Sequence, residues 1–454
     1  MDYAALSAAQ RTYYLSGATR SLAARQEALQ KLFKAIKAYE KPLADAVKVD
    51  LNRPAYETYM CETGVVLDEI RYIRRRLPRW VKEKRVSTSI KQIFGRGYIC
   101  PEPRGVVLII SPWNYPVQLC LLPLVAALAA GNCAVIKPSV KAAATGAVLQ
   151  EMLSGVFPPE QVSVVLGSHE ETAPLLEQRW DYVFFTGSAA AGREILRKSA
   201  EHLTPVLLEL SGKSPVIIDP TADLALAAKR IAFGKILNAG QTCVAPDYVL
   251  IHESVRDRFV EEYRKALGSF FPKNDMSSMA HIITPEHFRR VAGLLEGENA
   301  AIGGGTDEQT LFIEPTVLID VRADAPIMQE EIFGPVLPLL TWTDIVECLD
   351  FVRSRPTPLA LYLFSKDKTL QRRVLDSCSF GGGCINDTML HVNSPKMPFG
   401  GVNESGMGRY HGRAGFDTFT NYRSMLCKNG RTDTSVRYRP YNKMKSVLLH
   451  RLVR

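Results

Sequence analysis

Cys243, in the segment GQTC (240–243), has the sequence surroundings expected of a nucleophile. It follows a stretch of helical character, AKRIAFGKILNAG (228–240), so we expect the thiol at a turn. A thiolate is strongly nucleophilic, and nearby helix ends or backbone N–H groups lower the pKa of a thiol. Cys243 is therefore a candidate nucleophile, and simple buried packing is the alternative for any one of the nine cysteines.

Two polar residues stand where apolar runs end. Glu209 follows PVLL (205–208), and Asn114 follows VVLII (106–110) within the segment PWNYP. A carboxylate in such a place either finds buried partners or is poised as a base. The Asn114 amide either donates to an oxyanion or caps the helix that follows.

A glycine turn, FTGSAAAGR (185–193), lies between the apolar run YVFF and a predicted helix. Backbone N–H groups at such a helix start point toward an anion, which suits a nucleotide phosphate bound near Gly187 and Ser188. The spacing of Gly187 and Gly192 is that of a P-loop, but Arg193 and Glu194 follow where Lys and Ser or Thr are needed. This departure weakens an ATP-using interpretation, and a purely structural glycine turn is the other alternative.

Short apolar runs that alternate with helical stretches must position these residues. Residues 1–80 have the periodicity of amphipathic surface helices. A first α/β unit is predicted from five runs, at 106–110, 133–137, 162–166, 182–185 and 215–218. A second α/β region spans about 222–392, with strand candidates at 249–253, 316–320, 336–340 and 359–364. Continuous apolar strands separated by helices indicate parallel sheets covered on both faces, so the fold class is α/β.

Composition bounds the classes of function. The 454 residues are 46% hydrophobic and 23% charged, and 56 Lys and Arg against 47 Asp and Glu give a net charge of +9. No nucleic-acid-binding motif accompanies that charge, and no CxxC, HExxH or Cys/His cluster predicts a metal site. The nine cysteines form no disulfide framework, and the chain shows no signal peptide or membrane-length apolar run. We expect a cytoplasmic protein.

Six short motifs together resemble the aldehyde dehydrogenase superfamily. In chain order they are SPWN (111–114), IKPS (136–139), FTGS (185–188), ELSGK (209–213), GQTC (240–243) and EIFGP (331–335). The segments PFGGVNESGMGRYHG (398–412) and RYRPY (437–441) look like the class 3 branch of fatty and aromatic aldehyde dehydrogenases. The resemblance implies oxidation of a medium- or long-chain aliphatic or an aromatic aldehyde to the acid by NAD or NADP, through a cysteine thiohemiacetal and thioester.

The resemblance also implies a role for each matching residue. It makes Cys243 the nucleophile, Asn114 the oxyanion donor and Glu209 the base that activates water. It places Lys137 and Glu331 on the two riboses of the cofactor. The remaining cofactor contacts implied or expected are Gly187 and Ser188 near the adenosine-pyrophosphate half, Phe333 on the nicotinamide side, and Trp113, Val140 and Lys141.

Position 140 departs from the class 3 pattern, which usually has a glutamate there. A carboxylate would accept from the ribose 2′-hydroxyl of NAD and repel the 2′-phosphate of NADP, whereas Val140 does neither. The neighbouring Lys141 offers positive charge to that phosphate, unless it points to solvent while Val140 only packs. We expect NADP to be accepted at least comparably with NAD.

The family fold implies a Rossmann-like cofactor domain (1–78 and 105–210) and an α/β catalytic domain (211–394). A β bridging element (79–104 and 395–430) would join two subunits of a homodimer, and a basic tail (431–454) follows. Met444, Val447 and Leu448 share one predicted helical stripe in this tail, with basic residues around them. That pattern suits peripheral contact with an anionic membrane, and a packed or disordered tail is the alternative.

Two other enzyme classes stay open. A CoA-acylating relative would keep Cys243 but would need no base to activate water, so Glu209 favours hydrolysis. A P-loop-like nucleotide-using enzyme would depend on the turn from Gly187 to Gly192.

Overall fold

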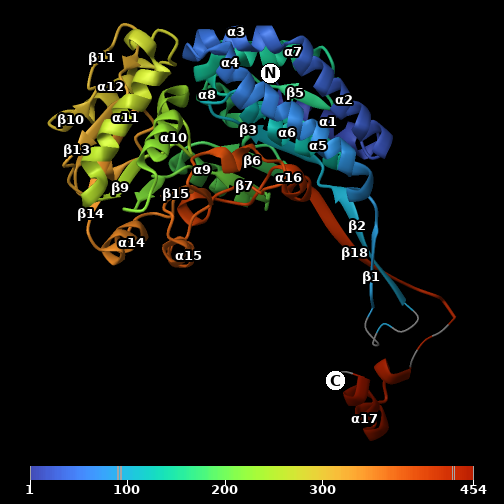
Figure 1. Ribbon diagram of the computed structural model, residues 1–454. Coiled ribbons are helices and arrows are strands. Elements are labelled where there is room, and N and C mark those ends of the chain that lie inside the picture. The colour runs from blue at the N-terminus through green and yellow to red at the C-terminus, as the bar shows by residue number, and fades with distance from the viewer. Residues whose placement is uncertain (1, 89–91, 93–94, 432, 434, 453–454) are drawn as a thin grey trace.

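A computed structural model describes residues 2–88, 92, 95–431, 433 and 435–452. The predicted segments 79–104 and 431–454 therefore lie partly outside the described residues. Figure 1 shows two α/β bodies side by side and a β-ribbon that leads away toward the C-terminal helix.

Helices form most of the N-terminal region, as their apolar spacing predicts. They are α1 (Tyr3–Leu15), α2 (Leu22–Ala38), α3 (Glu40–Leu51), α4 (Ala55–Thr58), a π-helical turn (Tyr59–Thr63) and α5 (Gly64–Trp80). Helix α2 buries Leu29, Leu32 and Ile36 fully, while its charged face stays toward solvent. An amphipathic helix is stabilised mainly by burial of such a stripe against the protein core.

The first sheet has six strands in the order β17-β7-β6-β3-β4-β5, and all are parallel except β17. The strands are β3 (Val106–Ile110), β4 (Cys133–Lys137), β5 (Val162–Val164), β6 (Tyr182–Thr186), β7 (Val206–Glu209) and β17 (Gly406–Met407). The helices of this part are α6 (Gln118–Ala130), α7 (Ala143–Ser154), α8 (His169–Thr172), α9 (Ala189–Glu201) and α16 (Gly412–Thr418). Helix α6 is apolar on all sides because it packs between the sheet and the outer helices.

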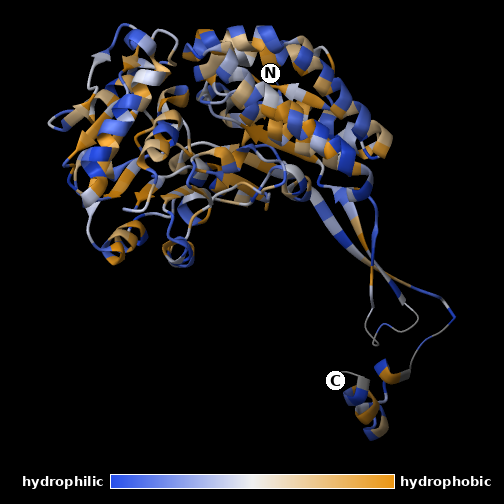
Figure 2. Ribbon diagram, viewed as in Figure 1, coloured by the Kyte–Doolittle hydropathy of each residue, from blue (hydrophilic) through white to orange (hydrophobic). Residues whose placement is uncertain are grey.

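The second sheet has seven strands in the order β10-β13-β14-β9-β8-β15-β16. They are β8 (Pro215–Ile218), β9 (Tyr248–His252), β10 (Asn299–Ile302), β13 (Thr316–Ile319), β14 (Val336–Trp342), β15 (Ala360–Phe364) and β16 (Gly382–Ile385). Its helices are α10 (Leu224–Ile236), α11 (Arg256–Phe270), α12 (Pro285–Gly293), α13 (Pro326–Gln329), α14 (Ile345–Arg353) and α15 (Lys368–Ser377), with the small hairpin β11 (Thr306–Asp307) and β12 (Phe312–Ile313). Figure 2 shows hydrophobic residues concentrated along the strands of both bodies.

One predicted strand belongs to a different sheet from the one expected. The run 215–218 forms β8, but β8 pairs with β9 and β15 in the second sheet rather than joining the first unit. The chain leaves the first sheet at Ser211 and Gly212, whose φ angles are 75° and 156°. Apolar sequence predicts a buried strand, but the turn before the strand directs it to one sheet or the other.

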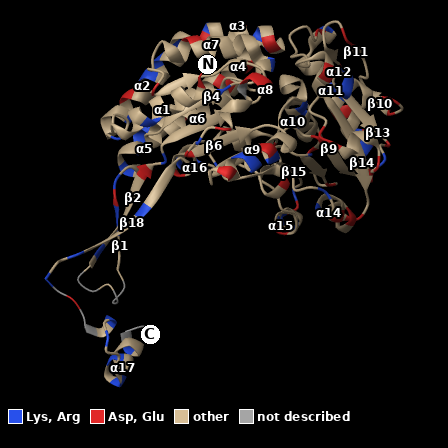
Figure 3. Ribbon diagram, turned by 180° about the vertical axis from the view of Figure 1, so that it is seen from behind, with Lys and Arg blue, Asp and Glu red and all other residues tan. Residues whose placement is uncertain are grey.

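The third sheet is a long ribbon of β1 (Lys84–Val86), β2 (Gly95–Pro103) and β18 (Thr420–Lys428), all antiparallel. Beyond it lies helix α17 (Lys443–Leu452), which Figure 1 shows apart from both bodies. The ribbon of this terminal region carries Lys and Arg positions, coloured blue in Figure 3. Among the described residues, the model contains no helix with the length and apolar character needed to cross a membrane.

Candidate active site

Most of the predicted site residues line one cavity of about 350 Å³. Of the two cavities that Cys243 lines, this is the larger, and we call it the larger cavity. Asn114, Gly187 and Glu209 reach it because β3, β6 and β7 are parallel and end at the same edge of the first sheet. Eight of the predicted residues line it: Trp113, Asn114, Gly187, Ser188, Glu209, Cys243, Glu331 and Phe333. The other three, Lys137, Val140 and Lys141, are not among its lining residues.

Cys243 follows three residues in the left-handed region, Asn238, Ala239 and Gly240, so the predicted turn is present. Gly240 is required there because a Cβ atom would lie 2.3 Å from the Gly334 carbonyl oxygen. Loss of hydration raises the pKa of the Cys243 thiol above its ordinary range, and the nearby carboxyls raise it further. Backbone N–H groups of Cys243 and Val244 partly oppose this rise in pKa.

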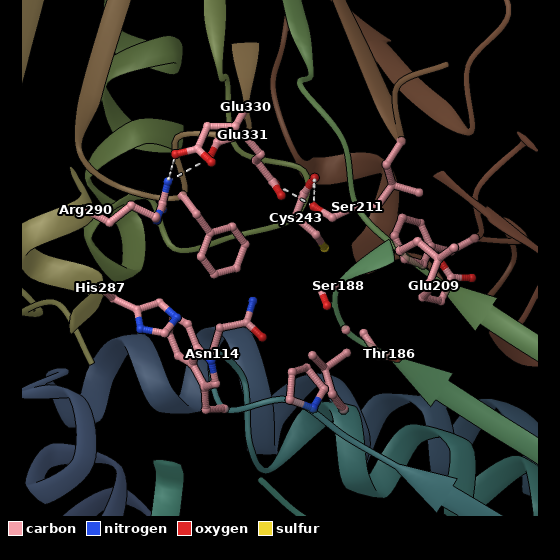
Figure 4. A pocket seen from close by; sticks show the side chains of 18 of the residues that line it. Asn114, Thr186, Ser188, Glu209, Ser211, Cys243, His287, Arg290, Glu330 and Glu331 are labelled. Atoms are coloured by element: carbon pink, nitrogen blue, oxygen red, sulfur yellow. Dashed lines mark hydrogen bonds and ion pairs between the residues drawn. The ribbon is translucent and has the colours of Figure 1, made fainter. Parts of the chain in front are cut away.

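Asn114 is buried, and its Nδ2 donates to the Gln241 carbonyl oxygen at 3.0 Å. Figure 4 shows its amide pointing into the same cavity as the Cys243 thiol. Helix α6 begins later, with Val117 at its N-cap, so the alternative that Asn114 caps this helix is wrong. The amide nitrogen has two hydrogens, and the bond to Gln241 uses one of them.

Glu209 ends β7 with its carboxyl inside the protein. Neither of its side-chain oxygens has a hydrogen-bond partner among the residues that the structure describes. Burial raises the pKa of Glu209 well above its ordinary value, and the positive charge of Arg409 only partly opposes this rise. A buried carboxyl without a protein partner is suited to hold and deprotonate a water molecule.

Aromatic rings form the facing wall of the larger cavity. The ring of Trp113 meets Phe333 edge-on at 5.5 Å and His287 at 5.3 Å between centroids. Phe333 has a φ of 50°, which is unusual for a bulky residue. Arg290 helps to hold this strained segment, since it donates to the backbone carbonyl oxygens of Glu331 (3.2 Å) and Ile332 (2.6 Å).

Glu331 accepts a hydrogen bond from the Ser211 hydroxyl, as Figure 4 shows. Loss of hydration and the neighbouring Asp247 raise the pKa of Glu331 to about 8. A protonated or ionised carboxyl at this wall can bond with hydroxyl groups of a ligand.

The start of α9 lies on the other side of the larger cavity. Ser188 is the N-cap of α9 and its side chain accepts from the Ala191 N–H, as the glycine turn predicts. Gly187 packs so tightly that a Cβ atom would lie 2.6 Å from the Phe185 ring. The first N–H groups of a helix point out of its end, so the start of α9 is suited to bind an anion.

The remaining predicted cofactor residues lie outside the lining of the larger cavity. Lys137 is buried, its Nζ donates to the Pro138 carbonyl oxygen at 2.8 Å, and burial lowers its pKa. Val140 is 53% exposed, so it does not merely pack. Lys141 Nζ lies 3.4 Å from His287 Nε2, which belongs to the second body.

A smaller cavity of about 90 Å³ shares Cys243 with the larger one. Its wall is mostly apolar and includes Met60, Cys61, Phe233, Leu237, Val244, Met389, Leu390, Val392 and Phe399. Cys243 therefore stands between a larger cavity, whose lining includes several polar side chains, and a smaller one that is mostly apolar.

Several lining residues were missed by the sequence prediction. Thr186 lies inside the motif FTGS and Ser211 inside ELSGK, so both could have been predicted from the motifs that contain them. Tyr410 lies inside the class 3 segment 398–412, whereas His287 and Arg290 lie outside every motif and gave no signal. Within the described part of the chain, no group of three or more Cys, His, Asp or Glu side chains is placed to hold a metal ion.

Comparison with known proteins adds evidence independent of this geometry. The pattern of the aldehyde dehydrogenase family matches residues 3–425. The 4,4'-diaponeurosporen-aldehyde dehydrogenase of Staphylococcus aureus is 45% identical over 95% of this chain and 95% of its own. Aldehyde dehydrogenase family 3 member B1 of Rattus norvegicus is 43% identical over 95% of this chain and 93% of its own.

Solved structures are similar over nearly the whole chain. A substrate-bound Staphylococcus aureus AldH superposes with a TM-score of 0.96 at 43% identity, covering 98% of both chains. A Staphylococcus aureus betaine aldehyde dehydrogenase in complex with NAD+ gives a TM-score of 0.85 at 27% identity, over 96% of this chain and 91% of that one. An Escherichia coli NADP-dependent enzyme gives 0.86 at 25% identity, over 94% and 90%.

Proposed function

The chain belongs to the aldehyde dehydrogenase family, and from that premise we propose that Cys243, Asn114 and Glu209 carry out NAD(P)+-dependent oxidation of an apolar aldehyde. The enzyme has the α/β aldehyde dehydrogenase fold, and aldehyde oxidation with NAD(P)+ is its reaction. The observation that carries the residue assignment is the place of Cys243 at the junction of the two cavities.

The larger cavity fits a nicotinamide cofactor. The α9 N-terminus with Gly187 and Ser188 suits the pyrophosphate, the Glu331 carboxyl suits a ribose, and Trp113 and Phe333 form an apolar wall for a flat ring. When bound, NAD(P)+ supplies the acceptor for the hydride that leaves the substrate.

The residues act in sequence on the carbonyl carbon. The Cys243 thiolate forms a C–S bond with it, and the second N–H of the Asn114 amide meets the negative charge that develops on oxygen. After the carbon loses its hydride, it is a thioester. Glu209 then takes a proton from water, whose oxygen attacks the carbon, and the C–S bond breaks to release the acid.

The apolar wall of the smaller cavity supports a medium- or long-chain aliphatic or an aromatic aldehyde. A panel of aldehydes, assayed by reduced-cofactor absorbance with NAD+ and with NADP+, tests this proposal. Apolar aldehydes should have the higher kcat/KM, and a preference for small polar ones would contradict it. Product analysis separates hydrolysis from CoA acylation, since a CoA thioester rather than free acid would exclude Glu209 as the base that completes turnover.

We also propose that NADP+ is accepted at least comparably with NAD+. Val140 and Lys141 are both exposed, and Lys141 Nζ lies 3.4 Å from His287 Nε2. Both features favour an added phosphate, because neither supplies a carboxylate that would repel it.

The assembly and location are proposed on separate grounds. The domain bounds given above stay a proposal, except that β17 and α16 belong to the first body, because β17 pairs with β7 and α16 packs on α6. A homodimer joined through the β-ribbon is supported by the exposed Tyr422, Met425 and Leu426 on β18. Nine free thiols support a reducing, cytoplasmic setting. The exposed apolar residues of α17 support peripheral contact with a membrane.

A further inference from the structure

A buried ion pair contacts the loop that carries Asn114. The side chains of Arg53 and Glu62 are 0% exposed, and the Arg53 guanidinium donates to the Glu62 carboxylate. Glu62 lies in the π-helical turn Tyr59–Thr63, a rare helical form that is frequent at functional sites. Because burying both charges removes their hydration, such a pair is weak evidence of a purely stabilising role.

Arg53 holds the loop from one side. Its Nη1 donates to the backbone carbonyl oxygen of Asn114 at 3.1 Å. Its guanidinium carbon lies 4.9 Å from the centre of the Tyr115 ring, and the Tyr115 hydroxyl is 2.7 Å from Thr242 Oγ1. Arg53 therefore contacts the main chain of the oxyanion residue and a ring that reaches the neighbour of the nucleophile.

Glu62 holds the loop from its other end. Its Oε2 accepts from the backbone N–H groups of Val117 at 2.6 Å and Gln118 at 2.9 Å, where α6 begins. The ion pair thus binds the main chain on both sides of Tyr115 and fixes the length and direction of the loop. A carboxylate at a helix N-terminus is also favoured by the helix dipole.

The loop is in turn joined to the segment before Cys243. Asn238 Nδ2 donates to the Asn114 backbone carbonyl oxygen (2.9 Å) and to that of Gln241 (3.1 Å). The Gln241 carbonyl oxygen also accepts from the Asn114 side chain. The distance between the Asn114 amide and the nucleophile therefore depends on where the Asn114 main chain is held.

We propose that the Arg53–Glu62 ion pair is a positioning device that aims the Asn114 amide at the oxygen of the substrate carbonyl. This inference rests on the proposed function, in which that amide donates to the oxyanion. Arg53 and Glu62 line neither the larger nor the smaller cavity, so they act through the loop. A displacement of about 1 Å at a reacting group can lower the rate on the order of 100-fold, so loss of this hold has a measurable effect.

A double-mutant cycle on the full-length enzyme tests the proposal. Arg53→Lys keeps the charge but replaces a rigid planar fork of donors by three donors on a single nitrogen, which are not spaced to reach both Glu62 and the Asn114 carbonyl in the same way. We expect kcat/KM for an aldehyde to fall roughly 10- to 100-fold. Alkylation of Cys243 by iodoacetamide, which needs no oxyanion donor, and the Kd for cofactor should change by less than about twofold.

The same substitution made in Asn114→Ala should lower kcat/KM further by less than about twofold, because the group that Arg53 aims is gone. The matched control is Arg11→Lys, which alters an ion pair with Asp181 in the same body and should leave kcat/KM unchanged. Equal losses in both backgrounds, or no loss in the native background, would overturn the proposal.

Two further results keep the test decisive. If Arg53→Lys does not fold, Glu62→Gln takes its place in the cycle, since the amide oxygen still accepts from the start of α6 while the hold on Arg53 weakens. If Asn114→Ala alone keeps near-native kcat/KM, the proposed oxyanion role fails, and that failure is separate from the outcome of the cycle.

Discussion

At the scale of single residues, Cys243 and Glu209 share a feature that shapes the chemistry. Burial raises the pKa of both the Cys243 thiol and the Glu209 carboxyl, so it opposes the charged form of each. Each must lose a proton before it acts, one as nucleophile and the other as base. The site therefore becomes more reactive as pH rises.

Cys243→Ser should abolish aldehyde oxidation while cofactor binding remains, because a hydroxyl is a poor nucleophile at neutral pH. Turnover by reduced-cofactor absorbance and the Kd for cofactor by fluorescence titration measure the two effects. Near-native turnover in this variant would show that another residue is the nucleophile.

Glu209→Gln should allow the first hydride transfer but stall hydrolysis, since an amide cannot take the proton of water. Mass spectrometry after one turnover should find the acyl group on Cys243. In the wild type, hydrolysis should accelerate as pH rises through the raised pKa of this carboxyl, because only the ionised form takes the proton of water, and the variant should lose this rise. Unchanged turnover with no adduct would count against Glu209 as the base.

Val140→Glu should shift the ratio of kcat/KM values toward NAD+, because a carboxylate there accepts from a ribose hydroxyl and repels a 2′-phosphate. Steady-state kinetics with both cofactors measure the ratio, and Val140→Gln separates the hydrogen bond from the charge. A wild type that strongly prefers NAD+ would show that this position does not set the choice.

At the scale of elements, α17 differs from the other helices. Met444 is 77% exposed, and Val447, Leu448 and Leu449 are exposed beside it, with basic residues around them. An apolar stripe with a basic border binds an anionic lipid surface by burial and by charge attraction.

Liposome sedimentation tests whether α17 binds an anionic membrane surface. The full chain should pellet with anionic vesicles, less so at high salt, and a chain that ends at Asn442 should stay in the supernatant. Neutral vesicles serve as the control for the charge contribution. Equal pelleting of both chains would contradict the proposal that α17 binds a membrane.

At the scale of the whole molecule, the β-ribbon extends away from both bodies and leaves Tyr422, Met425 and Leu426 exposed on β18. We propose that these exposed apolar side chains form an interface with a second subunit. The strands pair along all nine residues of β18, so the ribbon is formed within one chain before any partner binds.

The wild type should sediment as a dimer, and the double variant Met425→Glu and Leu426→Lys should shift it toward monomer, because charges are costly to bury in an interface. Analytical ultracentrifugation over a range of concentrations measures the equilibrium. A monomeric wild type would exclude the ribbon as a dimer interface, and a dimeric variant would place the interface elsewhere.

The sequence by itself determined the local elements, the family and which side chains are proposed as the reacting groups. Runs such as 106–110, 133–137 and 215–218 became strands at their predicted bounds, since apolar β-branched residues favour buried strands over short distances. Ordered motifs around Cys243, Glu209 and Asn114 identified the family, because a reaction demands particular side chains.

Only the tertiary structure decided which elements share a sheet and which side chains share a cavity. The assignment of β8 to the second sheet, the place of His287 beside Lys141, and the binding of Arg53 to the Asn114 loop all join segments distant in sequence. Such contacts depend on the packing of whole layers, and neither periodicity nor motif spacing carries that information. The raised pKa of Glu209 has the same origin, because burial is a property of the folded chain.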